Sequence, residues 1–149
     1  MRSALGAIAL GALAKKPELL TGSVIRNLER LARNALRFAK ESDQEASILN
    51  HLEFQDAIVK ASNLEKTARY FEELTAEVVR FNNLLKMSYT DREKDAEERV
   101  DALAQALKEN DFAAAESIWR QSFTLAAERF IERVVTVDDG AFERKSRPD

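Results

Sequence analysis

The chain has 149 residues, which suits one domain with a single core. Its net charge of −3 gives no general attraction to nucleic acid, and the absence of Cys excludes disulfides and thiolate metal sites. Hydrophobic residues make up 45% and charged residues 33%, which is a globular composition, and no apolar run reaches the ~20 residues that span a bilayer.

Apolar residues recur at helical spacing along most of the chain, and 4 Gly and 2 Pro leave few helix breakers. The pattern predicts an all-α fold, a single antiparallel bundle of about six helices with no convincing strand. The expected helices cover residues 3–16, 23–39, 43–63, 64–89, 90–110 and 111–135. Ser23, Asp43 and Asp111 have the short polar side chains that favour helix N-caps.

The structure expected at the two ends of the chain is less clearly indicated by the sequence than that of the middle. Residues 1–14 are nearly all apolar behind a single Arg, so they form either a buried first helix, which we favour, or a short cleaved secretion signal. The apolar pattern stops after Val135. We therefore expect one helical domain over 1–135 and a polar tail over 136–149, whose basic end is disordered.

Several polar side chains interrupt the apolar sides of the expected helices. Gln55 and Ser122 are neutral groups inside such stripes, and Thr75 and Asn82 interrupt the stripe of the long helix. Buried polar groups need hydrogen-bond partners, which are other side chains, water or a bound ligand. An apolar space with a few convergent polar groups is typical of a small-molecule site.

Three further residues belong to this candidate site. His51 lies four residues before Gln55, so both project from one helix face, and His51 is either a partly exposed His or a hydrogen-bonding group of the pocket. Val100 and Trp119 would supply apolar wall, although a Trp at such a position is more often plain core.

Short motifs occur along the chain in a recognisable order and spacing. They are Arg2 with Leu5 and Gly6, then His51-Leu52-Glu53-Phe54-Gln55 and Ala61-Ser62-Asn63, then Arg99-Val100, Leu103, Ala106, Asp111, Ala115 and Ser122-Phe123. Over residues 1–135 this order resembles the FCD domain, the all-helical C-terminal effector-binding domain of the FadR subgroup of GntR-type bacterial transcription regulators.

The resemblance implies a cytoplasmic homodimer that senses an organic acid or related metabolite. In the family an Asp and three His hold a metal ion, and the matching positions here are His51, Gln55, Val100 and Ser122. Gln and Ser are poor ligands and Val cannot ligate, so we expect no metal cofactor and a neutral or more apolar effector. The family's winged helix-turn-helix domain precedes this one, so no direct nucleic-acid binding by this chain is expected.

The sequence contains no catalytic constellation. It has no Cys, a single His and scattered Gly, so no nucleophile–base pair or phosphate loop is apparent and we expect no enzyme. The leading interpretation is an effector-sensing and dimerisation domain. The alternative is a helical dimerisation or interaction module with a filled core. The space between Gln55, Val100 and Ser122 distinguishes these two interpretations, because an effector can bind only if this space is open.

Overall fold

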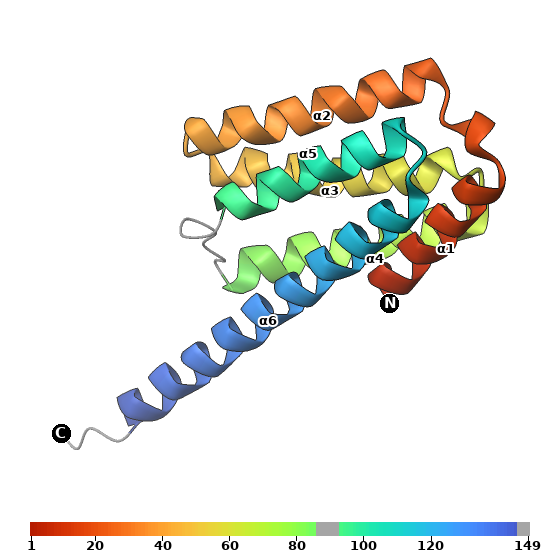
Figure 1. The fold of residues 1–149 in the computed structure, drawn as a ribbon. Helices are drawn as coiled ribbons and strands as arrows, with labels where there is room; N and C mark the ends of the chain where they lie inside the picture. The colour runs from red at the N-terminus through yellow and green to blue at the C-terminus, as the bar shows by residue number, and fades with distance from the viewer. Residues whose placement is uncertain (86–92, 146–149) are drawn as a thin grey trace.

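A computed structural model of the chain describes residues 1–85 and 93–145. Within these ranges it contains six α-helices and no strand, which confirms the predicted all-α bundle (Figure 1). The elements are α1 (Arg2–Lys15), the 3-10 helix η1 (Pro17–Leu19), α2 (Gly22–Lys40), α3 (Gln44–Ala61), α4 (Glu65–Leu85), α5 (Glu93–Lys108) and α6 (Phe112–Lys145). The predicted end of the fourth helix at residue 89, the start of the fifth at residue 90 and tail residues 146–149 lie outside the described residues.

Short polar side chains set the starts of three helices. Asp43 accepts a hydrogen bond from the Ala46 N–H at 3.1 Å, and Asp111 caps α6 in the same way, as predicted. The predicted cap at Ser23 is wrong. Thr21 has the extended backbone of an N-cap, and its hydroxyl accepts from the Val24 N–H at 3.3 Å, so α2 begins at Gly22.

Three helices end at residues with a left-handed backbone. Ser42, Asn63 and Asn110 have φ values of 56°, 56° and 57° and follow α2, α3 and α5. Asn tolerates this conformation better than most side chains, because its short polar group bonds to the nearby backbone. These positions let the chain reverse between neighbouring helices, so α2 and α3 pack side by side.

The N-terminal helix is an integral part of the core. α1 packs against α3, α4 and α6, while α2 packs against α3 and α5 (Figure 1). Ala9, Leu10 and Leu13 of α1 are at most 1% exposed. A segment buried this way stabilises the bundle by excluding apolar surface from water, so the structure supports the buried first helix rather than a cleaved signal at residues 1–14.

The last helix is longer than expected. α6 starts beside α1 and projects from the bundle as far as Lys145, so the predicted end of the helix at Val135 is wrong (Figure 1). Residues 136–145 contain no Pro, and only Gly140 strongly disfavours a helix. Each further residue adds a backbone hydrogen bond to an existing helix, so an apolar stripe is not required.

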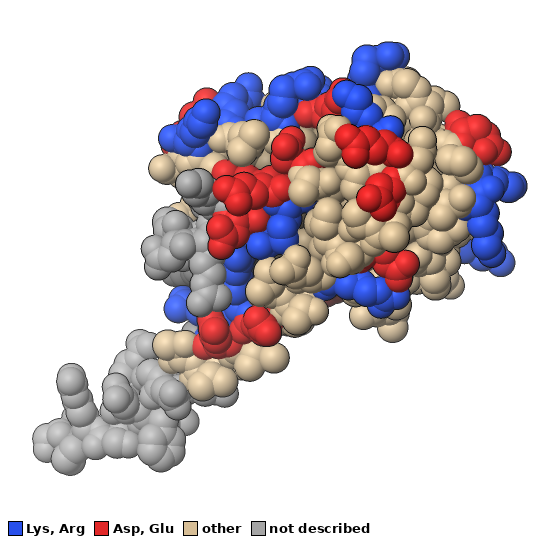
Figure 2. Space-filling view, in the orientation of Figure 1, with Lys and Arg blue, Asp and Glu red and all other residues tan. Residues whose placement is uncertain are grey.

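Acidic and basic side chains are interspersed on the face drawn in Figure 2, mainly along α2 and α5, and the surface around α1 carries fewer charges. Over the described ranges, no helix combines the length and apolar character needed to cross a bilayer.

Candidate functional site

A cavity of about 130 Å³ lies between the helices, and residues from α1 to α6 line it. Five of the seven candidate residues belong to its lining: His51, Gln55, Asn82, Val100 and Ser122. The structure therefore brings together side chains from α3, α4, α5 and α6. Thr75 and Trp119 lie outside this lining.

His51 and Gln55 contact each other on the inner face of α3. The Nε2 atoms of the two side chains are 3.0 Å apart. Burial, together with the positive charges of Arg2, Arg99 and Arg129, lowers the pKa of His51 to about 4. His51 is therefore neutral at pH 7, and its Nε2 accepts a hydrogen bond from the Gln55 amide. The Gln55 side chain is 6% exposed, and its Oε1 has no partner among the described residues.

The other two positions that match the family's metal ligands, Val100 and Ser122, carry side chains that bind metal ions poorly or not at all. Val100 is 3% exposed and supplies apolar wall. The Ser122 hydroxyl donates to the Ile118 carbonyl one turn earlier, at 2.9 Å. Over the described residues, no group of three or more His, Asp or Glu is arranged to hold a metal ion. The donor set therefore does not fit the metal that the resemblance implies.

Charged residues that the candidate site did not include also line the cavity. They are Arg2 from α1, Glu97 and Arg99 from α5, and Arg129 from α6. The sequence contains signals for two of these four residues: Arg99 directly precedes Val100, and Arg129 follows Ser122 by seven residues, which is two helical turns. Neither signal is decisive, because an Arg beside an apolar stripe usually extends to solvent.

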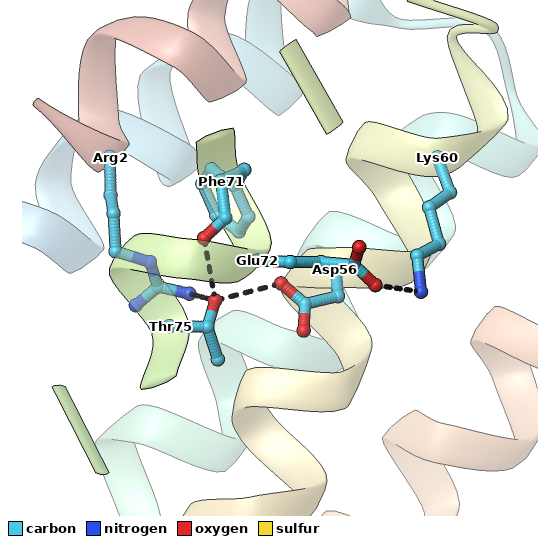
Figure 3. Close-up of polar contacts among 6 residues, drawn as sticks. All are labelled: Arg2, Asp56, Lys60, Phe71, Glu72 and Thr75. Carbon is cyan, nitrogen blue, oxygen red and sulfur yellow. Dashed lines mark hydrogen bonds and ion pairs between the residues drawn. The ribbon is translucent and has the colours of Figure 1, made fainter. Parts of the chain in front are cut away.

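Thr75 belongs to a hydrogen-bonded network beside the cavity rather than to its wall (Figure 3). Its hydroxyl accepts from Arg2 Nη2 at 3.0 Å and donates to Asp56 Oδ1 at 2.9 Å, with the Phe71 carbonyl 3.0 Å away as the alternative acceptor. Lys60 and Glu72 form an ion pair nearby. The network ties α1 to α3 and α4, and it gives one guanidinium N–H of Arg2 a partner inside the bundle.

Burial is the main cause of the pKa shifts of the charged groups in this network. Arg2 is 9% exposed, and desolvation lowers its pKa to about 10, with the charge of Asp56 opposing the shift. Desolvation raises the pKa of Asp56, while the hydrogen bond from Thr75 and the charge of Arg2 lower it. The Arg2 guanidinium also lies over the Phe71 ring, 4.4 Å from its centroid. Arg2 therefore remains a cation at pH 7 within a largely buried setting.

Trp119 is part of the core. Its side chain is 1% exposed, its Nε1 donates to the Ser3 carbonyl at 3.0 Å, and its ring centroid lies 5.1 Å from that of Phe123. A Cβ atom at Gly6 would lie 1.8 Å from Trp119 Cζ2, so the indole occupies the space that Gly6 leaves free. Of the two interpretations of Trp119, packing of α6 against α1 is the one the structure supports.

Comparison with known proteins agrees with the motifs. The family model of the FCD domain matches residues 1–125. Comparisons with curated proteins and with solved structures gave no significant match. The matched region contains α1 to α5, the first turns of α6 and all four positions of the family's metal set. The chain therefore belongs to the FCD domain family, the effector-binding domains of GntR-family regulators.

Proposed function

We propose that this chain is the effector-sensing domain of a GntR-type transcription regulator of the FadR subgroup, and that it binds a small metabolite without a metal ion. The single observation that supports the proposal most is the cavity of about 130 Å³ between the helices. A filled core, as in the alternative interaction module, would leave no such space among Gln55, Val100 and Ser122. An engineered apolar cavity of about 150 Å³ accepts benzene, so this volume suits a comparably small ligand.

A ligand in this cavity would contact several helices at once. Its walls include His51 and Gln55 of α3, Val100 of α5 and Ser122 of α6. A ligand that binds one arrangement of these helices more tightly shifts the population toward that arrangement. The shift would regulate transcription if an attached DNA-binding domain took a different orientation in each of the two arrangements. In this proposal the chain senses the effector and does not itself contact nucleic acid.

A thermal-shift screen of small metabolites against the metal-free protein tests the proposal. A ligand of the native state raises the midpoint of unfolding by mass action. The Val100→Phe variant, which places a ring in the cavity, is expected to lose the shift, whereas Glu116→Gln on the exposed side of α6 keeps it. Circular dichroism verifies that both variants are folded. Equal shifts in wild type and Val100→Phe, or no shift with any metabolite, would contradict sensing in this cavity.

We further propose that the domain forms a homodimer in the cytoplasm, as its family membership suggests. Exposed apolar side chains on α6 support self-association. Ile131, Val134 and Val135 are 64%, 46% and 54% exposed, and their spacing places them on one side of the helix. The same residues favour the alternative function, a dimerisation module. Sedimentation of wild type and of Ile131→Lys tests the interface, and a monomeric wild type at micromolar concentration would contradict it.

A further inference from the structure

A groove runs along α3 on the outside of the bundle, and we call it the α3 groove. Its volume is about 770 Å³, against about 130 Å³ for the cavity. α2 and α4 both pack against α3. Residues of α3 between 49 and 61 form the floor of the groove, and residues of η1, α2 and α4 form its sides. The floor extends for about 18 Å at ~1.5 Å per residue, a length that suits a polypeptide segment better than a compact metabolite.

The α3 groove exposes apolar side chains. Leu49 is 48% exposed, and Ala57 lies two turns further along the same face of α3. Half-buried apolar residues flank them from the neighbouring elements: Leu19, Val24 and Val79. A row of apolar side chains between two helices is the surface on which an amphipathic helix lays its own apolar face.

Carboxylates outnumber cations in the α3 groove. Glu18, Glu53 and Asp56 belong to its lining, against the single ammonium of Lys60, which is already paired with a glutamate of α4. Glu53 lies 3.6 Å from Arg30, but both side chains are more than half exposed, so this pair is weak. Over the described residues, no group of three or more His, Asp or Glu is arranged to hold a metal ion. The groove therefore suits an organic cation.

Asp56 is the most buried of the three carboxylates. It is half-buried, whereas Glu18 and Glu53 are exposed. Its Oδ1 accepts from the Thr75 hydroxyl at 2.9 Å, and its Oδ2 has no hydrogen-bond partner among the described residues. Desolvation raises the pKa of this carboxyl more than its neighbours lower it. A Lys or Arg side chain that pairs with Oδ2 would stabilise the carboxylate by a charge-assisted hydrogen bond.

A chain of hydrogen bonds joins the α3 groove to the cavity. Asp56 and Thr75 line the groove, whereas Arg2 lines the cavity. The Thr75 hydroxyl bonds to both charged side chains (Figure 3). The charge of Arg2 also contributes to the lowered pKa of His51 in the cavity. A cation that pairs with Asp56 weakens the attraction of Asp56 for Arg2, and this changes the field at His51.

We propose that the α3 groove docks a cationic amphipathic helix of a partner protein. A Lys or Arg of that helix pairs with Asp56, and its apolar side chains cover Leu49. Docking alters the polar groups of the cavity through Thr75 and Arg2. The inference goes beyond the proposed function, because it requires no metabolite to bind. Charge complementarity and the length of the apolar floor identify the occupant.

NMR titration of the full chain with four probes tests the docking site. The first is a synthetic helical peptide with Leu on one face and Lys on the other. The second has Glu in place of every Lys, the third has Ala in place of every Leu, and the fourth is spermidine, a small organic cation. We expect the Lys–Leu peptide to bind below millimolar concentration, with shifts centred on η1, α3, the first half of α2 and the middle of α4. The other three should bind at least tenfold more weakly, since each lacks the charge, the apolar face or the length.

Variants assign the contacts to residues. Asp56→Asn keeps an acceptor for Thr75 but removes the charge, and it should weaken binding of the Lys–Leu peptide about tenfold. Leu49→Ala, at a half-exposed position, should weaken it several-fold with little effect on the fold. Glu45→Gln is the matched control, because Glu45 lies exposed on α3 outside the groove, and it should leave binding unchanged. Thermal unfolding of each variant verifies the fold.

The single His of the chain makes the link to the cavity measurable, because its ring signals can be assigned without ambiguity. The ring signals of His51 should shift when the Lys–Leu peptide binds to the wild type. In Thr75→Val, which removes the bridging hydroxyl, the peptide should still bind, but the His51 signals should no longer respond.

The outcomes separate docking, its link to the cavity and the proposed function. Shifts outside the α3 groove, or no binding of the Lys–Leu peptide, would overturn the docking site. Equal binding of the Glu peptide or of spermidine would overturn it too, as would unchanged binding in both Asp56→Asn and Leu49→Ala. An unchanged His51 in the peptide-bound wild type would overturn the link alone. The sensing function stands or falls separately, by the thermal-shift screen with Val100→Phe.

Discussion

Acidification tests whether His51 is held neutral inside the bundle. Its pKa is lowered from 6.5 to about 4, first by burial and then by three arginine charges. In the unfolded chain those causes vanish, so His51 regains a pKa near ~6.5. Between these values the unfolded state binds a proton that the folded state does not, and the free energy of unfolding must fall as the pH falls.

The magnitude follows from the two pKa values. Above pH ~7 both states carry a neutral His51, so the group does not make stability depend on pH. From pH 7.5 to 5.5 the expected loss is about 1 kcal/mol, and the full shift to about 4 corresponds to a loss of about 3 kcal/mol at most. The His51→Gln variant keeps a neutral partner for Gln55 but cannot titrate. It should therefore lack this part of the pH dependence.

Urea unfolding of both proteins at several pH values between 7.5 and 5.5 measures the effect. The difference between wild type and His51→Gln removes the contributions of the shared carboxylates, including Asp56, whose pKa is raised in the folded state. If the two proteins lose stability in parallel over this range, His51 is not buried in a neutral form and the reasoning fails.

Three further predictions concern packing, the network of Arg2 and metal binding. Gly6→Ala should destabilise the protein by about 1–3 kcal/mol through overpacking against Trp119, and this cost should disappear in a Trp119→Leu background, as a double-mutant cycle by chemical unfolding would measure. Thr75→Val should cost about 1–3 kcal/mol because Arg2 and Asp56 lose their bridging hydroxyl, and Thr75→Ser, which keeps it, should unfold near the wild-type denaturant concentration. Titration calorimetry with zinc, nickel or manganese should show no one-to-one site, and micromolar binding to the native fold would contradict the reading of the donor set.

The helices could be predicted because helix formation depends on local patterns. The spacing of apolar residues gave six helices in the correct order, and Asp43 and Asp111 marked two of their starts. The errors lie where local signals compete or run out. The predicted cap Ser23 lies two residues after the actual cap Thr21, and the last helix continues past Val135 without an apolar stripe.

The candidate site was predictable only in part. An apolar stripe identifies the inner face of a helix, so His51, Gln55, Asn82, Val100 and Ser122 could be placed on inner faces and do meet at one cavity. Short motifs around several of these residues also indicated the FCD family, and the family match over residues 1–125 shows this membership. An apolar stripe does not show which helices pack against each other. It therefore could not show that Trp119 belongs to the core, or that Thr75 belongs to a polar network, rather than to the cavity wall.

The sequence by itself determined the fold class, the family and the absence of the usual metal ligands at positions 51, 55, 100 and 122. The tertiary structure decided the electrostatics of the space that remains. Arg2, Arg99 and Arg129 lie on three different helices, and packing of α1, α5 and α6 brings them around one cavity. Charges interact through space rather than along the chain, so the surplus of positive charge became visible only when the helices were packed.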